Sequence, residues 1–475
     1  STPIKSSAAS DVYKRQIMSK TTKVAIVSLG CSKNQVDAEQ MMAKIADRGY
    51  AFVAEPGMAD IVLVNTCGFI QSAKEEAIGW IMELIDLKNE GRIKRIVVTG
   101  CLSERYRDQF AEEFPEIDAV VGIAEYGKIA DIIDGLADFE KPSHEEGTPA
   151  VCYFGRKESH SMEGKRIIST LPHYAYLRIA DGCDNCCTYC AIPKIRGRFR
   201  SRRMEDIVEE TKLLAKDGVK EIVIIAQDVT RYGLDLYNKL ALPELLDKLC
   251  EIEGLKWIRL LYCYPERVTD ELIDCIKRQD KIVKYLDIPM QHCSDEILKR
   301  MNRKTTGAEL RALVAKLRRE IPGITLRTTF ITGFPGETEE QFNELGEFAE
   351  EMRFERMGCF AYSEEEGTPA ASFPDMVDEE VREHRKEIIE EQQDTRVAEM
   401  YESMIGSTDE VVVEGYDKYL AEGGLYFGRS AMYAPEIDGM IYFSVPKGAE
   451  KPHIGDFVKV RFDDVIDNNL LGEMV

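Results

Sequence analysis

Short apolar runs alternate with amphipathic stretches between Lys23 and about Gly135. The runs, rich in β-branched residues, are Val24–Val27, Ile61–Val64 and Ile96–Val98. Parallel strands that are buried on both faces read as continuous apolar runs of this kind, and amphipathic helices connect them. The pattern predicts an α/β fold that begins with an open parallel sheet, in an N-terminal domain spanning 23–140.

A second series of strand–helix units follows a polar segment, 141–168, which reads as a linker. Its six candidate strands begin near Tyr174, Glu221, Trp257, Ile282, Ile324 and Arg356. Six units suit a partial (β/α)6 barrel better than a full eightfold barrel, and they place a central domain at 169–404. A charged helix over 377–404 is expected to end this domain.

After Gly406 the pattern changes to short strands with alternating apolar and polar positions. The candidates are 410–414, 426–429, 439–444 and 457–462. Such strands, separated by turn residues, predict a small antiparallel β-barrel over 405–475.

Composition limits the possible functions. The chain has 475 residues and a net charge of −23, which suits a basic protein partner better than a phosphate backbone. No apolar run reaches the roughly 18 residues of a membrane helix. The thirteen cysteines are unevenly spaced, and this favours metal or redox chemistry in a reducing cytoplasm over a disulfide scaffold. Residues 1–17 are polar and are expected to be a non-native or disordered extension.

Four cysteines lie within eight residues, in the loop after the first strand of the central series. They are Cys183, Cys186, Cys187 and Cys190. Two CxxC pairs suggest zinc, but zinc-binding pairs are normally separated by a dozen or more residues. A redox disulfide is a second alternative. The CxxxCxxC spacing of 183, 187 and 190 favours an iron–sulfur cluster held by three thiolates, with Cys186 as the alternative ligand.

Three further cysteines occupy equivalent places in the N-terminal series. Cys31, Cys67 and Cys101 each follow one of the three predicted strands by three or four residues. The carboxyl ends of parallel strands line one crevice, so the three thiols are expected to converge there. Any one of them alone reads as a small buried hydrophobe, but the repeated placement favours a second three-thiolate cluster. The other cysteines are isolated and are expected to be structural.

These motifs resemble a known family. CxxxCxxC with Tyr189 before its last cysteine is similar to the radical S-adenosylmethionine (SAM) superfamily. The three earlier cysteines and the small β domain resemble its methylthiotransferase branch, over nearly the whole chain from Lys23 to Val475. The likeness is strongest to members that modify a ribosomal protein. The segments that carry it are Ser28–Asn34, Asn65–Ile70, Val98–Leu102, Ala226–Asp228, Arg231–Gly233, Asp287–His292, Gly333–Glu337 and Ala434–Gly439.

The resemblance implies two [4Fe–4S] clusters and SAM as cofactors. The cluster on Cys183, Cys187 and Cys190 would bind SAM and generate a 5′-deoxyadenosyl radical. That radical would take hydrogen from the β-carbon of an aspartate in small-subunit ribosomal protein S-twelve. The cluster on Cys31, Cys67 and Cys101 would carry sulfur, and a second SAM would supply the methyl group.

The family register also suggests cofactor contacts and partners. The candidate cofactor contacts are Tyr189, Gln227, Asp228, Asp287, Gly333 and Pro335. Buried structural hydrogen bonds are the equal alternative for Gln227 and the two aspartates. For Gly333 and Pro335 the alternative is a tight turn before a capping box at Thr338. An electron donor such as flavodoxin or ferredoxin is implied, whereas the sulfur source is not indicated.

Two other functions share part of this pattern. A tRNA adenosine methylthiotransferase of the same branch would share both clusters, but an RNA-binding tail should be basic. Residues 401–475 carry six basic and fourteen acidic residues, a balance of −8 that argues against tRNA and for a basic protein. The remaining alternative is a non-catalytic iron–sulfur or zinc scaffold. A basic run over 194–203 is expected to pair with acidic residues at a domain interface rather than to bind phosphate.

Overall fold

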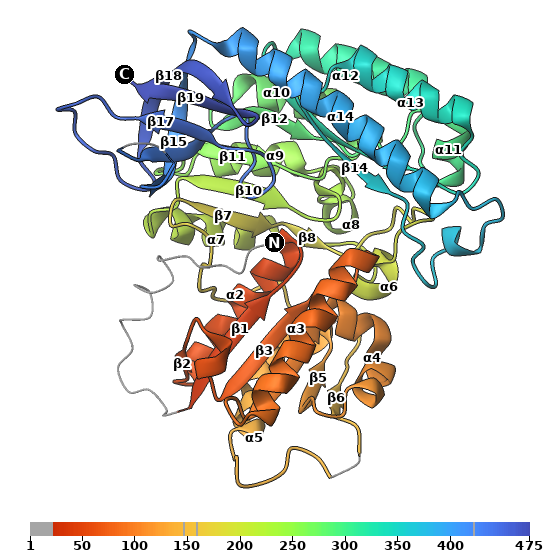
Figure 1. The fold of residues 1–475 in the computed structure, drawn as a ribbon, viewed down its shortest axis with the longest axis vertical. Helices are drawn as coiled ribbons and strands as arrows, with labels where there is room; N and C mark the ends of the chain where they lie inside the picture. The colour runs from red at the N-terminus through yellow and green to blue at the C-terminus, as the bar shows by residue number, and fades with distance from the viewer. Residues whose placement is uncertain (1–21, 146–147, 158–159, 421–422) are drawn as a thin grey trace. The chain divides into compact units, whose positions relative to one another are not determined.

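The computed structural model describes residues 22–145, 148–157, 160–420 and 423–475 (Figure 1). The extension predicted over 1–17 lies outside these ranges. The chain forms two compact units. Unit 1 contains the described residues up to Leu171 together with 180–202 and 363–371, and unit 2 contains 172–179, 203–362 and 372–475. None of the helices in the described ranges is long and apolar enough to cross a membrane.

Unit 1 is built on a six-stranded parallel sheet in the order β2-β1-β3-β4-β5-β6. Its strands are β1 (Lys23–Ser28), β2 (Ala51–Phe52), β3 (Ile61–Thr66), β4 (Arg95–Gly100), β5 (Ala119–Val121) and β6 (Val151–Tyr153). Its helices are α2 (Ser32–Asp47), α3 (Gln71–Asn89), α4 (Cys101–Glu113), α5 (Ile129–Leu136) and α6 (Ile192–Arg196), with 3-10 turns η2 (Pro56–Met58) and η3 (Ile123–Lys128). A short hairpin joins β8 (Ala180–Asp181) to β9 (Arg200–Ser201).

The central strand β3 shows why this sheet is buried on both faces. Ile61 and Leu63 belong to the apolar cluster that contains α2 and α5 residues. Val62 points the other way, into a cluster with the α3 residue Ile81. The alternation follows from the two-residue period of a strand, and it confirms the predicted open parallel α/β sheet.

The sheet is wider than the sequence pattern indicated. Strands β1, β3 and β4 were predicted, whereas β2, β5 and β6 were not. Strand β6 lies inside 141–168, so the segment predicted as a linker contributes an edge strand to the sheet. Strands of two or three residues are too short to show a period of two, and this explains why they were missed.

Unit 2 contains a second six-stranded parallel sheet, in the order β14-β13-β12-β11-β10-β7. Its strands are β7 (Tyr174–Arg178), β10 (Glu221–Ile225), β11 (Trp257–Leu260), β12 (Ile282–Asp287), β13 (Thr325–Thr332) and β14 (Arg356–Ala361). The helices of unit 2 are α7 (Met204–Lys216), α8 (Leu234–Tyr237), α9 (Leu242–Cys250), α10 (Asp270–Arg278), α11 (Asp295–Arg300), α12 (Gly307–Glu320), α13 (Glu339–Met352) and α14 (Glu379–Met404), with 3-10 turns η5 (Val229–Arg231) and η6 (Pro265–Arg267). The six strands confirm the partial (β/α)6 barrel.

The C-terminal part of unit 2 is a closed barrel, drawn in dark blue in Figure 1. Its strands are β15 (Thr408–Asp417), β16 (Leu425–Ser430), β17 (Ile441–Ser444), β18 (Phe457–Ile466) and β19 (Asn469–Met474). The predicted antiparallel barrel needs one correction, because β17 and β19 pair in parallel. Strand β19 was also missed. It follows β18 through a two-residue turn in which Asp467 and Asn468 both have positive φ, and the sequence lacks the glycine that usually marks such a turn.

A buried ion network joins the barrel to the parallel sheet inside unit 2. Glu221 on β10 accepts hydrogen bonds from Arg259 on β11 and Arg429 on β16, each at 2.8 Å. Arg429 also donates to Glu414 at 2.7 Å, and Glu414 lies 3.2 Å from His173. These side chains are almost completely buried, so each charge depends on its partners.

Replacing Glu221 with Gln is expected to lower the free energy of unfolding by about 3–5 kcal/mol at pH 7, because two buried guanidinium groups lose their shared partner. Burial alone raises the pKa of Glu221, but Arg429 and Arg259 lower it to about 2. A carboxylate with a lowered pKa contributes stability above its unfolded pKa of about 4.3, and this contribution is lost as the pH falls toward 2. Urea denaturation should therefore show a large difference in the free energy of unfolding between wild type and Glu221→Gln at pH 7. This difference should become smaller below about pH 4. A difference that does not change with pH would contradict the role given to this network.

Candidate active site

The cysteines of the N-terminal set lie where strands of unit 1 lead into helices. Cys31 is the residue before α2, and Cys101 is the first residue of α4. Cys67 directly follows β3. The N-terminus of a helix carries a partial positive charge, which attracts negative charge placed near it.

Glycines let these junctions approach each other closely. Gly30 has φ +88°, and a Cβ at this position would lie 2.5 Å from the Cβ of Cys67. Gly100 has φ +105°, and its Cβ would lie 2.3 Å from the carbonyl oxygen of Thr66. A larger residue at either position would push the cysteine-bearing loops apart, so the close packing depends on glycine.

The three thiols of this set are close enough to affect one another. Burial and, to a smaller extent, the neighbouring Cys31 thiol raise the pKa of Cys67 to about 11. Burial also raises the pKa of Cys101. Arg196 lowers this pKa, and the Cys67 and Cys31 thiols raise it by smaller amounts. Because the thiolate is the metal-binding form, iron must displace protons from these sulfurs as it binds.

Asn34 organises the loops around these cysteines. Its side-chain nitrogen donates to the carbonyl oxygens of Leu29 at 3.1 Å and Thr66 at 2.8 Å. Its side-chain oxygen accepts from Arg196 at 2.8 Å and lies 3.5 Å from the sulfur of Cys101. One buried amide therefore connects the ends of β1 and β3 to the start of α4.

The CxxxCxxC loop also belongs to unit 1, between β8 and α6. Cys183 and Cys187 are buried and Cys190 is half-buried, whereas Cys186 is exposed and has φ +52°. Burial and the neighbouring Cys187 raise the pKa of Cys190. The CxxxCxxC spacing of Cys183, Cys187 and Cys190 remains the basis for taking these three thiols as the ligand set.

A segment from much later in the chain holds this loop. The Ala370 amide donates to the carbonyl oxygen of Thr188, inside the CxxxCxxC motif, at 2.9 Å. The buried Glu365 accepts from Arg105 at 2.6 Å and from Lys74 at 3.0 Å. The segment 363–371 is thereby joined to α3 and α4 as well as to the cysteine loop.

Both thiol sets fit iron–sulfur clusters by their chemistry. Within the described ranges, no group of three or more His, Cys, Asp or Glu side chains surrounds a single metal-ion position. In a [4Fe–4S] cluster each thiolate binds a different iron, so its ligands surround a cluster and not one ion. Sulfur is also the donor that these clusters require, and each set offers three such donors.

Three of the residues that are predicted to contact the cofactor, Asp228, Asp287 and Gly333, form hydrogen bonds within the protein. Asp228 is buried and accepts from Arg267 at 2.9 Å, and Asp287 accepts from Arg327 at 2.8 Å. Gly333 has φ +66° and donates its amide to Glu337 at 2.9 Å. The expected capping box is present, formed by Thr338 with Gln341. Contacts of these residues, and of Tyr189, Gln227 and Pro335, with SAM remain predictions.

Among the isolated cysteines, Cys152 and Cys250 are half-buried and the other four are buried. Burial raises the pKa of Cys275, Cys293 and Cys359 to about 12, and that of Cys263 is also well above its usual value.

Two features of the cysteine region were missed in the sequence. Asn34 was noticed only as part of a motif, although Asn34 and Asp37 lie three residues apart and so share a face of α2. Arg196 was placed in a basic run expected to pair with acidic residues, and it does pair with Asp37 at 2.8 Å and Asp181 at 3.2 Å. Its approach to a cysteine was not foreseen.

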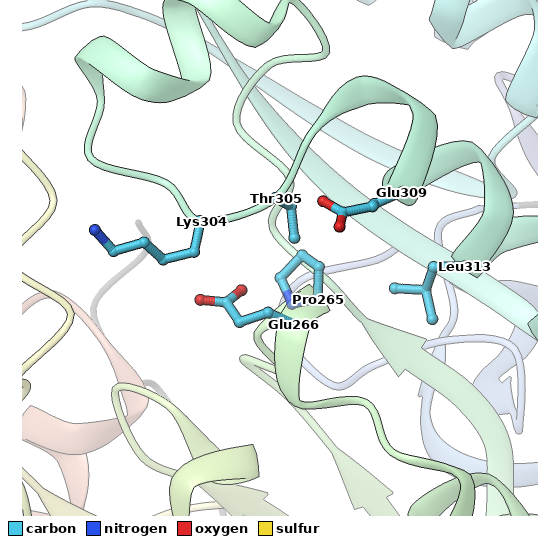
Figure 2. A pocket seen from close by; sticks show the side chains of 6 residues that line it. All are labelled: Pro265, Glu266, Lys304, Thr305, Glu309 and Leu313. Carbon is cyan, nitrogen blue, oxygen red and sulfur yellow. The ribbon is translucent and has the colours of Figure 1, made fainter.

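Unit 2 has a separate small pocket of about 240 Å³ between η6 and the start of α12 (Figure 2). It is lined by Pro265, Glu266, Lys304, Thr305, Glu309 and Leu313. Glu309 already accepts from the Thr306 amide in a capping box, so this carboxylate has a structural role. No chemistry is assigned to the pocket.

Comparison with known proteins identifies the family. Family models match residues 23–122 (uncharacterized protein family UPF0004), 177–349 (radical SAM superfamily) and 405–475 (TRAM domain). Curated relatives include the ribosomal protein uS12 methylthiotransferase RimO of Thermoanaerobacter sp., 46% identical over 95% of this chain and 99% of the relative. The same enzyme of Caldanaerobacter subterraneus is 48% identical over the same shares. This chain belongs to the RimO family of radical SAM methylthiotransferases.

A solved structure supports the fold expected of a RimO-family chain. The radical SAM methyltransferase TsrM from Kitasatospora setae matches with a TM-score of 0.52 and 15% identity, over 74% of this chain and 77% of that one. At this identity the likeness concerns the fold alone. For a RimO-family enzyme the radical SAM superfamily implies a [4Fe–4S] cluster and SAM.

Proposed function

We propose that this chain transfers a methylthio group to ribosomal protein uS12, the small-subunit protein S-twelve, at the β-carbon of an aspartate. The observation that carries the proposal is the pair of three-cysteine sets on loops of one compact unit. The relatives named uS12 methylthiotransferase, which match almost end to end, support the choice of reaction and substrate.

In this proposal Cys183, Cys187 and Cys190 hold the cluster that binds SAM, and Cys31, Cys67 and Cys101 hold a second [4Fe–4S] cluster. When bound, the clusters and SAM supply the radical and the sulfur that protein side chains lack. The chain's own residues orient these groups and keep water away from them. Asn34 and the glycine-bearing loops fix the first set, and the segment 363–371 holds the second loop in place.

Charge supports a basic protein substrate. The chain carries −23, and its C-terminal residues 401–475 carry six basic against fourteen acidic residues. In the segment that holds the cysteine loop, Glu364 and Glu366 are exposed on either side of the buried Glu365. Acidic surfaces of this kind attract a basic protein and repel the phosphates of tRNA. We place the reaction in the cytoplasm, with a flavodoxin or ferredoxin as electron donor.

The proposal is tested by incubating the reconstituted protein anaerobically with SAM, sulfide, dithionite and either uS12 or unmodified tRNA. Mass spectrometry should detect one added methylthio group on a uS12 aspartate and none on tRNA nucleosides. Modification of tRNA alone would replace this function with the adenosine-modifying one. Cluster assembly without cleavage of SAM would favour a non-catalytic scaffold.

A further inference from the structure

Arg196 is a buried guanidinium at the end of α6, six residues after Cys190. Its side chain is 1% exposed. One terminal nitrogen lies 2.8 Å from the side-chain oxygen of Asn34, 2.8 Å from Asp37 and 3.8 Å from the sulfur of Cys101. All these residues belong to unit 1.

The Arg196 side chain connects the helix that follows one cysteine set to two helices that begin at or directly after cysteines of the other set. Asn34 and Asp37 lie on α2, the helix that follows Cys31, while Cys101 begins α4. Arg196 itself lies on the helix directly after the CxxxCxxC loop. A planar guanidinium with several fixed partners has little freedom to move, so it fixes the position of this loop relative to α2 and α4.

Arg196 also brings a positive charge to a buried sulfur. Arginine remains protonated in proteins, and its interaction with a nearby charge is strong where water is excluded. Asp37 and Asp181 offset part of this charge, and His160 lies 3.5 Å and 3.9 Å from these two carboxylates.

We propose that Arg196 is a positioning residue that holds the Cys101 sulfur against the second cysteine loop and makes the cluster on Cys31, Cys67 and Cys101 easier to reduce. The proposal rests on the cluster assignment made under the proposed function. One electron from an external reductant adds negative charge to that cluster, and a fixed cation beside a ligand sulfur stabilises the reduced form. Hydrogen bonds to the sulfurs and net charge are known determinants of cluster potential.

The test uses the full-length chain with Cys183, Cys187 and Cys190 all changed to Ala, so that only the N-terminal cluster can form. After reconstitution, iron and sulfide are measured, and the midpoint potential is obtained by redox titration followed by electron paramagnetic resonance. Arg196→Gln should shift the midpoint to more negative values, and Arg196→Lys should restore part of the shift. Asp37→Asn should shift the midpoint to less negative values, because the loss of the Asp37 charge leaves more of the Arg196 charge uncompensated.

Arg202→Gln is the matched control, because Arg202 lies in the same basic run and pairs with Glu163 at 2.7 Å. Its midpoint should equal that of the parent. Opposite shifts for Arg196→Gln and Asp37→Asn distinguish an electrostatic role from a purely structural one, which would not produce opposite signs.

The iron, sulfide and midpoint measurements distinguish a failure of the cluster assignment from a failure of the role given to Arg196. If the parent triple variant binds no iron or sulfide, the N-terminal cluster assignment fails and the role of Arg196 fails with it. If the parent holds its cluster and the midpoints of Arg196→Gln and Asp37→Asn match the parent, the role of Arg196 alone is overturned. If Arg196→Gln does not fold, as judged by circular dichroism, an unchanged midpoint in Arg196→Lys and Asp37→Asn would overturn it.

Discussion

Changing Cys187 to Ala is expected to abolish both cleavage of SAM and modification of uS12. Cys187 is buried in the CxxxCxxC loop, and a cluster with three thiolate ligands cannot be held by two. Reconstituted wild type should hold about eight iron atoms per chain and the variant about four. Iron analysis and detection of 5′-deoxyadenosine after reduction measure the two effects.

The neighbouring Cys186 provides a matched control with the same substitution. Its thiol is exposed and its backbone has positive φ, so Cys186→Ala should keep both the full iron content and SAM cleavage. If Cys186→Ala lost the cluster while Cys187→Ala kept it, the ligand assignment would be wrong and the motif register would have to shift by one residue.

Changing Cys101 to Ala is expected to separate the two halves of the reaction. The variant should still cleave SAM, because Cys183, Cys187 and Cys190 are intact, but it should transfer no methylthio group to uS12. Cys101 is buried and faces both Asn34 and Arg196, so the loss of its sulfur removes the most enclosed ligand of the N-terminal set. Iron should again fall from about eight to about four atoms per chain.

The control for this prediction is Cys359→Ala, in unit 2. Cys359 is buried in β14 and belongs to neither three-cysteine set. The Cys359→Ala variant should keep both clusters and the full transfer activity. Methylthiolation of uS12 by Cys101→Ala at the wild-type rate would contradict the assignment of a sulfur-carrying cluster to the N-terminal set.

Much of the fold is readable from the sequence because its central strands are long and apolar. The first residues of β7, β10, β11, β12 and β14 coincide with the predicted starts, and β13 begins one residue later. The strands that the pattern does not predict are two or three residues long, as β2, β5 and β6 are, or follow an unusual turn, as β19 does. Their pairing depends on the neighbouring strand more than on their own sequence.

Both cysteine sets could be predicted from the sequence. Each N-terminal cysteine follows a predicted strand, and the other set has the CxxxCxxC spacing. The residues around them were not visible. Arg196 contacts Asn34 and Asp37, which lie 162 and 159 residues away in the sequence. No local sequence pattern predicts such a contact. In the same way, the hydrogen bond between Ala370 and Thr188 arises only from the tertiary fold.

We propose that this chain methylthiolates uS12 in cells. The most direct test of this proposal expresses the chain in a host that lacks its own uS12-modifying and tRNA-modifying methylthiotransferases, followed by mass spectrometry of uS12 and of digested tRNA. We predict a methylthio group on one uS12 aspartate with wild type, none with Cys187→Ala, and no change in tRNA. Unmodified uS12 in cells that contain the folded, cluster-loaded protein would contradict the account.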